Sequence, residues 1–99
     1  MLIRSQNREV LINFNSMAGA EIAEGPIKTI ITSYITGCSY LLGEYSDKAK
    51  AMKVLDMLQE AYSEYQIMLN FSVSYLHEFK EKTDGFAIFQ MPEDSEVEV

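Results

Sequence analysis

One histidine and one cysteine are the side chains best suited to nucleophilic or metal chemistry in this chain. His77 lies next to Glu78 and near Glu81, and these three side chains together would suit one divalent ion. Cys38 would pair with His77 in a thiol–imidazole site if the fold brought them together. A surface or half-buried structural histidine and a small buried cysteine are the simpler interpretations, and we expect both.

Other catalytic patterns do not occur in the sequence. The five glycines lack the spacing of a dinucleotide-binding loop and of a phosphate-binding P-loop, and there is no Gly-x-Ser-x-Gly elbow. Carboxylates are so numerous that no acid–base pair can be singled out without geometry. The sequence therefore predicts a protein that is not an enzyme and that uses neither a cofactor nor a metal.

An acidic segment at the end of the chain is better suited to binding than to catalysis. It carries the four carboxylates Glu93, Asp94, Glu96 and Glu98. Spaced negative charges of this kind would fit a groove lined with Lys and Arg, and the segment would alternatively add a strand to a partner's sheet. A solvated tail without a partner is the simpler interpretation.

Aromatic side chains in the second half of the chain are the other candidate contact. They are Tyr62, Tyr65, Phe71, Tyr75 and Phe79. Tyrosine is enriched at interfaces because it combines a large apolar body with a polar tip, so Tyr65 and Tyr75 are candidate partner-binding residues. Packing of these rings inside the fold is the simpler interpretation.

Composition limits the class of protein further. The chain has 99 residues, of which 47% are hydrophobic, and this favours one folded domain. Fifteen acidic and eight basic residues give a formal charge of -7, which repels nucleic acid and anionic lipid. A single cysteine excludes an internal disulfide, and no segment has the apolar length of a signal peptide or a membrane span. We expect a cytoplasmic protein that binds neither nucleic acid nor membrane directly.

Short β-rich segments fill the first half of the chain. Residues 1–6 and 10–14 predict a hairpin with a polar turn, and residues 18–24 predict a third strand before a Gly-Pro turn. Residues 28–36 are almost all β-branched or aromatic, and residues 39–45 follow as another strand in which Gly43 marks a bulge or a close approach.

A helix is predicted from residue 46 to residue 65. Its apolar stripe consists of Ala51, Leu55, Leu58, Tyr62 and Tyr65, widened by Met52 and Ala61. Ser46 is the expected N-cap, with Asp47 in the first turn. Residues 66–85 have mixed periodicity that favours helix over strand, and residues 86–91 predict a last strand that ends at Pro92.

These elements together predict an α+β fold. We expect an antiparallel meander of about five strands, packed by one or two helices and completed by a C-terminal strand. Residues 1–92 would form a single α+β domain, and residues 93–99 would form an acidic, mobile tail.

Three stretches of the chain resemble a group of short, uncharacterised proteins of Gram-positive bacteria, their phages and mobile elements. They are MLIRSQ with VLINFNS, LLGEYSDKAKAMKVLDMLQEAY, and FAIFQMPEDSEVEV, and they cover about half of the chain. The group supplies no catalytic residue. By analogy, the resemblance implies a protein that binds and blocks a host defence protein, as inhibitors of RNA-guided nucleases (anti-CRISPR proteins) do.

Two hypotheses follow for the function. The first is a non-enzymatic inhibitor whose partner is a host protein, such as a nucleic-acid-binding nuclease. The second is a structural or regulatory module that forms a homodimer through the helix stripe or an unpaired sheet edge, without an inhibitory role. The first expects a monomer or a homodimer, whereas the second requires self-association.

Overall fold

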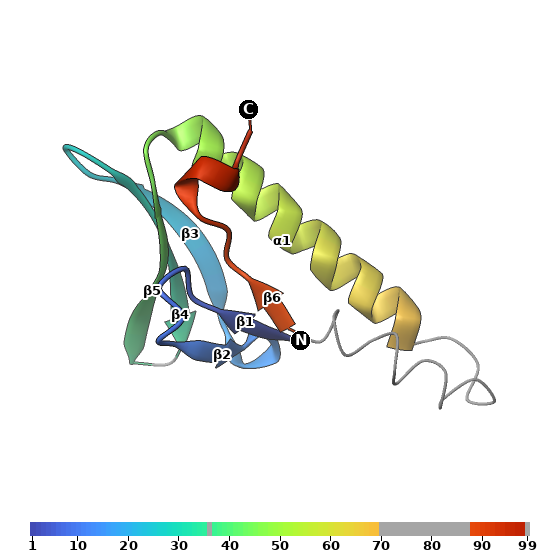
Figure 1. Ribbon diagram of the computed structural model, residues 1–99. Helices are drawn as coiled ribbons and strands as arrows, with labels where there is room; N and C mark the ends of the chain where they lie inside the picture. The colour runs from blue at the N-terminus through green and yellow to red at the C-terminus, as the bar shows by residue number, and fades with distance from the viewer. Residues whose placement is uncertain (36, 70–87, 99) are drawn as a thin grey trace.

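The computed structural model describes residues 1–35, 37–69 and 88–98. The protein is α+β, as predicted, with one α-helix and two small sheets in this part of the chain (Figure 1). The elements are β1 (Leu2–Arg4), β2 (Leu11–Asn13), β3 (Gly19–Glu24), β4 (Thr29–Ile35), β5 (Cys38–Tyr45), α1 (Lys48–Leu69) and β6 (Ile88–Gln90).

The first sheet joins the two ends of the chain. Its strand order is β2-β1-β6, so β1 lies in the middle. Ile3 pairs with Ile12 in the antiparallel β1–β2 hairpin, which confirms the predicted N-terminal hairpin. On its other side Ile3 pairs with Phe89 in the parallel β1–β6 ladder. The C-terminal strand is therefore held by the very start of the chain.

The second sheet is an antiparallel meander with the order β3-β4-β5. The meander thus has three strands, whereas about five were expected, because the N-terminal hairpin belongs to the other sheet. Asn13 explains the separation, since its side chain accepts a hydrogen bond of 3.0 Å from the Asn15 amide. The chain then turns into a short 3-10 helix, η1 (Phe14–Ser16), before β3 begins.

A β-bulge in β5 turns Tyr45 into the core. Leu41 pairs with Thr32 and Gly43 pairs with Ile31, so Leu42 is an extra residue in the ladder. Leu42 and Tyr45 are three residues apart and would face opposite sides of a regular strand, yet both are only 1% exposed. The predicted irregularity at Gly43 is therefore present, at the position next to the extra residue.

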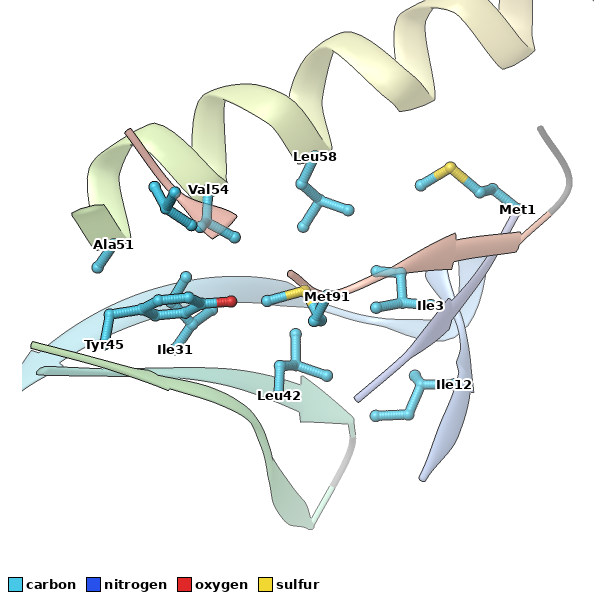
Figure 2. Close-up of a cluster of buried hydrophobic side chains, with 11 residues drawn as sticks. Met1, Ile3, Ile12, Ile31, Leu42, Tyr45, Ala51, Val54, Leu58 and Met91 are labelled. Atoms are coloured by element: carbon cyan, nitrogen blue, oxygen red, sulfur yellow. The ribbon is translucent and has the colours of Figure 1, made fainter. Parts of the chain in front are cut away.

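The core lies between α1 and the two sheets (Figure 2). Its buried side chains are Met1, Ile3, Ile12, Ile31, Leu42, Tyr45, Ala51, Val54, Leu58, Met91 and Val97. The prediction of the helix stripe was wrong at one edge, because Met52 is 47% exposed and Val54, which the stripe omitted, is completely buried. Positions 51, 54 and 58 follow the three- and four-residue steps of a helix face, and Met52 lies one position around from it.

The start of α1 also differs from the expectation. Asp47 precedes the helix, and its Oδ1 atom accepts a hydrogen bond of 2.8 Å from the Lys50 amide, which is the N-cap arrangement. Ser46 was the predicted cap, but its amide donates instead to Asp94. The helix continues beyond Tyr65 to Leu69. The rest of the predicted helix, to residue 85, lies outside the described residues.

Gln6 connects the two sheets. Its amide side chain donates to the Glu44 and Pro92 carbonyls at 3.0 and 3.1 Å and accepts from the Glu44 amide at 2.8 Å. The Gln6 backbone amide donates to the Leu42 carbonyl at 2.7 Å. Gln6, which lies two residues after the end of β1, therefore binds both the edge of β5 and the chain after β6.

Candidate functional site

Asp94 fixes the acidic C-terminal segment (residues 93–98) to the start of α1. Its carboxylate accepts from the Ser46 amide at 2.8 Å and lies 3.4 Å from Lys50 Nζ, while its carbonyl accepts from the same ammonium at 3.0 Å. The Ser46 amide, followed by Lys50, holds the pKa of this carboxyl below its usual value. Asp94 is therefore an anchor of the segment, and part of its charge is already neutralised.

The rest of the segment is ordered around this anchor, where the sequence led us to expect a mobile tail. Residues Asp94–Glu96 form a 3-10 helix, η3, in which the Glu93 amide donates to Glu96 Oε1 at 2.9 Å. Val97 is only 5% exposed and packs in the core, which removes it from water. Glu93, Glu96 and Glu98 remain exposed. Three of the four predicted contact residues are thus exposed on an ordered backbone, and the Glu96 carboxylate uses one oxygen for the Glu93 amide.

A polar cavity of about 430 Å³ lies beside this segment. Its lining includes Glu93 and Asp94, together with Glu44 and Lys28, which form an ion pair of 3.1 Å. Tyr45 also lines the cavity, and its hydroxyl donates to the Pro92 carbonyl at 2.9 Å. Burial raises the pKa of Tyr45, and the negative charge of nearby carboxylates, Glu93 first, raises it further. The Tyr45 hydroxyl is therefore a hydrogen-bond donor at neutral pH.

A row of carboxylates on α1 is a second acidic feature. Asp56, Glu60 and Glu64 are all exposed and follow one another at intervals of four residues. Four residues of α-helix rise about 6 Å, so the row runs along one side of α1. None of the three makes an ion pair with another residue of the described part of the chain. The four-residue spacing of these carboxylates is visible in the sequence, but none of them was predicted as a contact.

The candidate aromatic residues are divided between the described and the undescribed parts of the chain. Tyr62 is half-buried and stacks on Phe14, with ring centroids 4.3 Å apart. Tyr65 is also half-buried and packs at the rim of the core, which agrees with the simpler interpretation of these rings. Tyr75 lies outside the described residues, so its predicted role as a contact stays a prediction.

An apolar groove accompanies these rings. It has a volume of about 480 Å³ between α1 and β3, and its lining includes Phe14, Leu55 and Tyr62. This groove was not predictable from the sequence, because it depends on how closely α1 approaches β3.

Of the residues considered for nucleophilic or metal chemistry, the structure describes Cys38 alone. Cys38 begins β5 and is exposed, so the expectation of a buried cysteine was wrong. Its position next to the turn of the β4–β5 hairpin, at the first residue of β5, explains the exposure. His77 and its two neighbouring glutamates lie outside the described residues. Among residues 1–35, 37–69 and 88–98, no three His, Cys, Asp or Glu side chains are grouped as a metal would require.

The same part of the chain was searched for membrane-spanning helices, and none of its helices has the necessary length and apolar character. Comparison of the sequence with protein-family models and with curated proteins gave no match. Comparison of the fold with solved structures also gave none.

Proposed function

We propose that this protein is a non-enzymatic inhibitor that binds a basic surface of a host defence protein. The best candidate for the target is an RNA-guided nuclease, because such an enzyme holds its guide–target duplex in a positively charged channel. A protein that presents carboxylates at regular intervals competes for the Lys and Arg side chains that otherwise bind phosphates.

The carboxylate row of α1 is the observation that supports this proposal most strongly. Like charges four residues apart destabilise a helix by about 0.2–0.5 kcal/mol per pair. Asp56, Glu60 and Glu64 form two such pairs on an exposed face, and no described basic residue forms an ion pair with them. Repulsion within the row therefore lowers the stability of the helix. A cationic partner would relieve this repulsion, and the relief would add to the free energy of binding.

The acidic C-terminal segment supplies a second group of contacts. Asp94 fixes its backbone, and Glu93, Glu96 and Glu98 are exposed on that fixed backbone. Ordering in the free protein favours affinity, because less conformational entropy is lost on binding than from a flexible tail. We therefore assign the contact to these three glutamates and the α1 row together.

The test compares two triple variants with the wild-type protein. D56N/E60Q/E64Q removes the α1 row and E93Q/E96Q/E98Q removes the exposed glutamates of the segment, and each takes the formal charge from -7 to -4. Each variant is therefore the charge-matched control of the other. Binding to an RNA-guided nuclease loaded with guide RNA is measured between about 0.05 and 0.5 M NaCl, together with inhibition of DNA cleavage.

We expect wild-type affinity to fall steeply with salt and the α1 variant to lose at least about tenfold in affinity at 0.1 M salt. A smaller loss is expected for the segment variant, and thermal melting checks that both variants fold. Unchanged affinity in both variants would remove the carboxylates from the mechanism. Salt-tolerant binding that is instead lost in Tyr65→Ala would place the contact on the aromatic side of α1. Failure of the wild-type protein to bind the nuclease would overturn the proposed target.

A further inference from the structure

The outer edge of β5 is partly open, and the hydrogen bonds of the meander show which part. The Tyr34 carbonyl accepts from the Ala18 amide at 2.7 Å, so the backbone groups of Tyr34 face β3. Successive residues of an antiparallel strand alternate, and Ser33 and Ile35 therefore face β5, where they pair with Tyr40 and Cys38. The backbone groups of Ser39 and Leu41 consequently point away from β4.

The remainder of the edge is covered by Gln6. Its backbone amide donates to the Leu42 carbonyl, and its side chain takes both the amide and the carbonyl of Glu44. No residue in the described part of the chain forms a backbone or side-chain hydrogen bond of this kind with Ser39 or Leu41. Unpaired strand edges are templates for another strand, so residues 39–41 form an available edge segment.

We propose that the edge segment pairs with the same segment of a second copy of this chain. In an antiparallel pair around a two-fold axis, Ser39 lies opposite Leu41 of the second copy, and Leu41 lies opposite its Ser39. Ser39 and Leu41 of the two copies then form four N–H···O=C bonds in total. The two-fold axis passes between the two Tyr40 residues. The two meanders become one sheet of six strands.

Charge favours a second copy as the occupant of this edge. A chain of formal charge -7 repels its own copies over most of its surface, whereas residues 37–43 contain no ionisable group apart from one cysteine and one tyrosine. The free edge of β3, at the other side of the same sheet, carries Glu21 and Glu24. Two β3 edges would therefore place like charges together, and two β5 edges would not.

Exposed apolar side chains next to the edge segment add to the pairing. Tyr40 is 39% exposed and Leu41 is 44% exposed, and both would lose surface to the second copy. Tyr34, which is 38% exposed, shares the outer face of the sheet with Leu41, because Tyr34 pairs with Ser39 and Leu41 with Thr32. Leu41 of the second copy would lie opposite Ser39 and beside Tyr34, where it buries further apolar surface.

Sedimentation between about 10 μM and 1 mM tests the association. We expect the wild-type protein to form dimers across this range and Leu41→Lys to raise the dissociation constant at least about tenfold. Met52→Lys is the matched control, because Met52 on α1 is 47% exposed against 44% for Leu41. A wild-type protein that stays monomeric at 1 mM overturns the proposal.

A disulfide tests the register independently. In this register, residue 40 of one copy lies directly opposite residue 40 of the other, in a non-hydrogen-bonded pair. The Cα atoms of such a pair are about 4.5 Å apart, which is within the range of a disulfide. C38S/Y40C should therefore give a covalent dimer on mild oxidation, whereas C38S/M52C should not. Equal cross-linking of both variants would overturn the register. A monomeric protein that loses nuclease binding in Leu41→Lys would show that the edge receives a strand of another protein, which also overturns the proposal.

Discussion

At the scale of single residues, Gly43 and Tyr45 show how a small side chain makes room for a large one. The ring of Tyr45 lies over Gly43, so a Cβ atom at position 43 would be 2.9 Å from Tyr45 Oη and 3.0 Å from its Cε2 atom. Tyr45 cannot move freely, because it is buried and its hydroxyl is bound to the Pro92 carbonyl. Glycine at position 43 is therefore required by packing.

Gly43→Ala should destabilise the protein by about 1–3 kcal/mol, since the added methyl group overpacks the core against the Tyr45 ring. Urea denaturation followed by circular dichroism measures this change. Gly19→Ala is the matched control in the neighbouring β3, because a Cβ atom there meets nothing within 4 Å. Equal stability of the two variants would contradict the packing argument.

Asp94 gives the fold a dependence on acid pH. Its pKa is lowered in the folded protein from the ordinary value of 3.8, mainly by the Ser46 amide. A group with a depressed folded-state pKa contributes stability above its unfolded pKa, and the contribution is lost as pH falls through the folded value. The wild-type protein should accordingly lose its Asp94-dependent stability below about pH 4.

Melting temperatures of the wild-type protein and Asp94→Asn between pH 7 and pH 2.5 test this. The wild type should be the more stable at pH 7, and the difference should shrink as the pH falls below about 4. Asp56→Asn, at an exposed carboxylate without a described ion pair, is the control and should not be less stable than the wild type at pH 7, because the substitution removes repulsion within the α1 row. A difference that is independent of pH would show that Asp94 acts without its charge.

At the scale of elements, α1 combines a buried face with a charged face that works against helix stability. Ala51, Val54 and Leu58 hold the first part of the helix on the sheets. Burial of these side chains contributes far more than the few tenths of a kcal/mol that the carboxylate row removes. The helix therefore tolerates the row, and the row remains available for a partner.

Glu60→Lys should stabilise the helix by about 0.8–2 kcal/mol, because two like-charge pairs become two opposite-charge pairs at four-residue spacing. The same variant should weaken binding to the nuclease. Glu60→Gln is the control, since it removes repulsion without adding a positive charge. Chemical denaturation measures the stability of the variants, and the binding assay measures their affinity for the nuclease. A loss of stability in Glu60→Lys would contradict the prediction.

The sequence predicted the positions of the strands better than which strands pair with one another. Strand ends for β3, β4 and β5 were predicted to within one residue, because β-branched side chains and glycines mark them locally. The pairing of β1 with β6 left no such mark, since it joins positions such as Ile3 and Phe89 that are far apart in the chain. The choice of Asp47 over Ser46 as N-cap was equally invisible, because both residue types are favourable caps and only the position of the first helical turn decides which side chain accepts from the Lys50 amide.

The candidate site was predicted only in part, for the same reason. The acidic segment was recognised from its composition, but its order depends on the burial of Val97 and on the anchor at Asp94. Both are contacts with α1 and the core that a local pattern does not contain. The α1 row was readable from its spacing, and only its lack of described ion pairs makes it a candidate contact.

At the scale of the whole molecule, Gln6 is the side chain on which the arrangement of the two sheets depends. It satisfies the amide and carbonyl of Glu44 and the carbonyl of Pro92, three backbone groups from distant parts of the chain. Gln6→Ala should therefore destabilise the protein by about 1–3 kcal/mol, since the Glu44 amide and carbonyl lose this partner and the Pro92 carbonyl keeps only the Tyr45 hydroxyl. Gln59→Ala, at an exposed position of α1, is the control for denaturation. Equal effects of the two substitutions would contradict this role.

The central position of β1 also determines when the polypeptide can fold during its synthesis on the ribosome. Ile3 leaves the ribosome well before its parallel neighbour Phe89 and the buried Met91 and Val97. Contacts between distant positions form slowly, because a long intervening loop must first be closed. The nascent chain should accordingly hold an open edge on β1 until β6 has been synthesised, and chaperones that shield such edges should raise its yield.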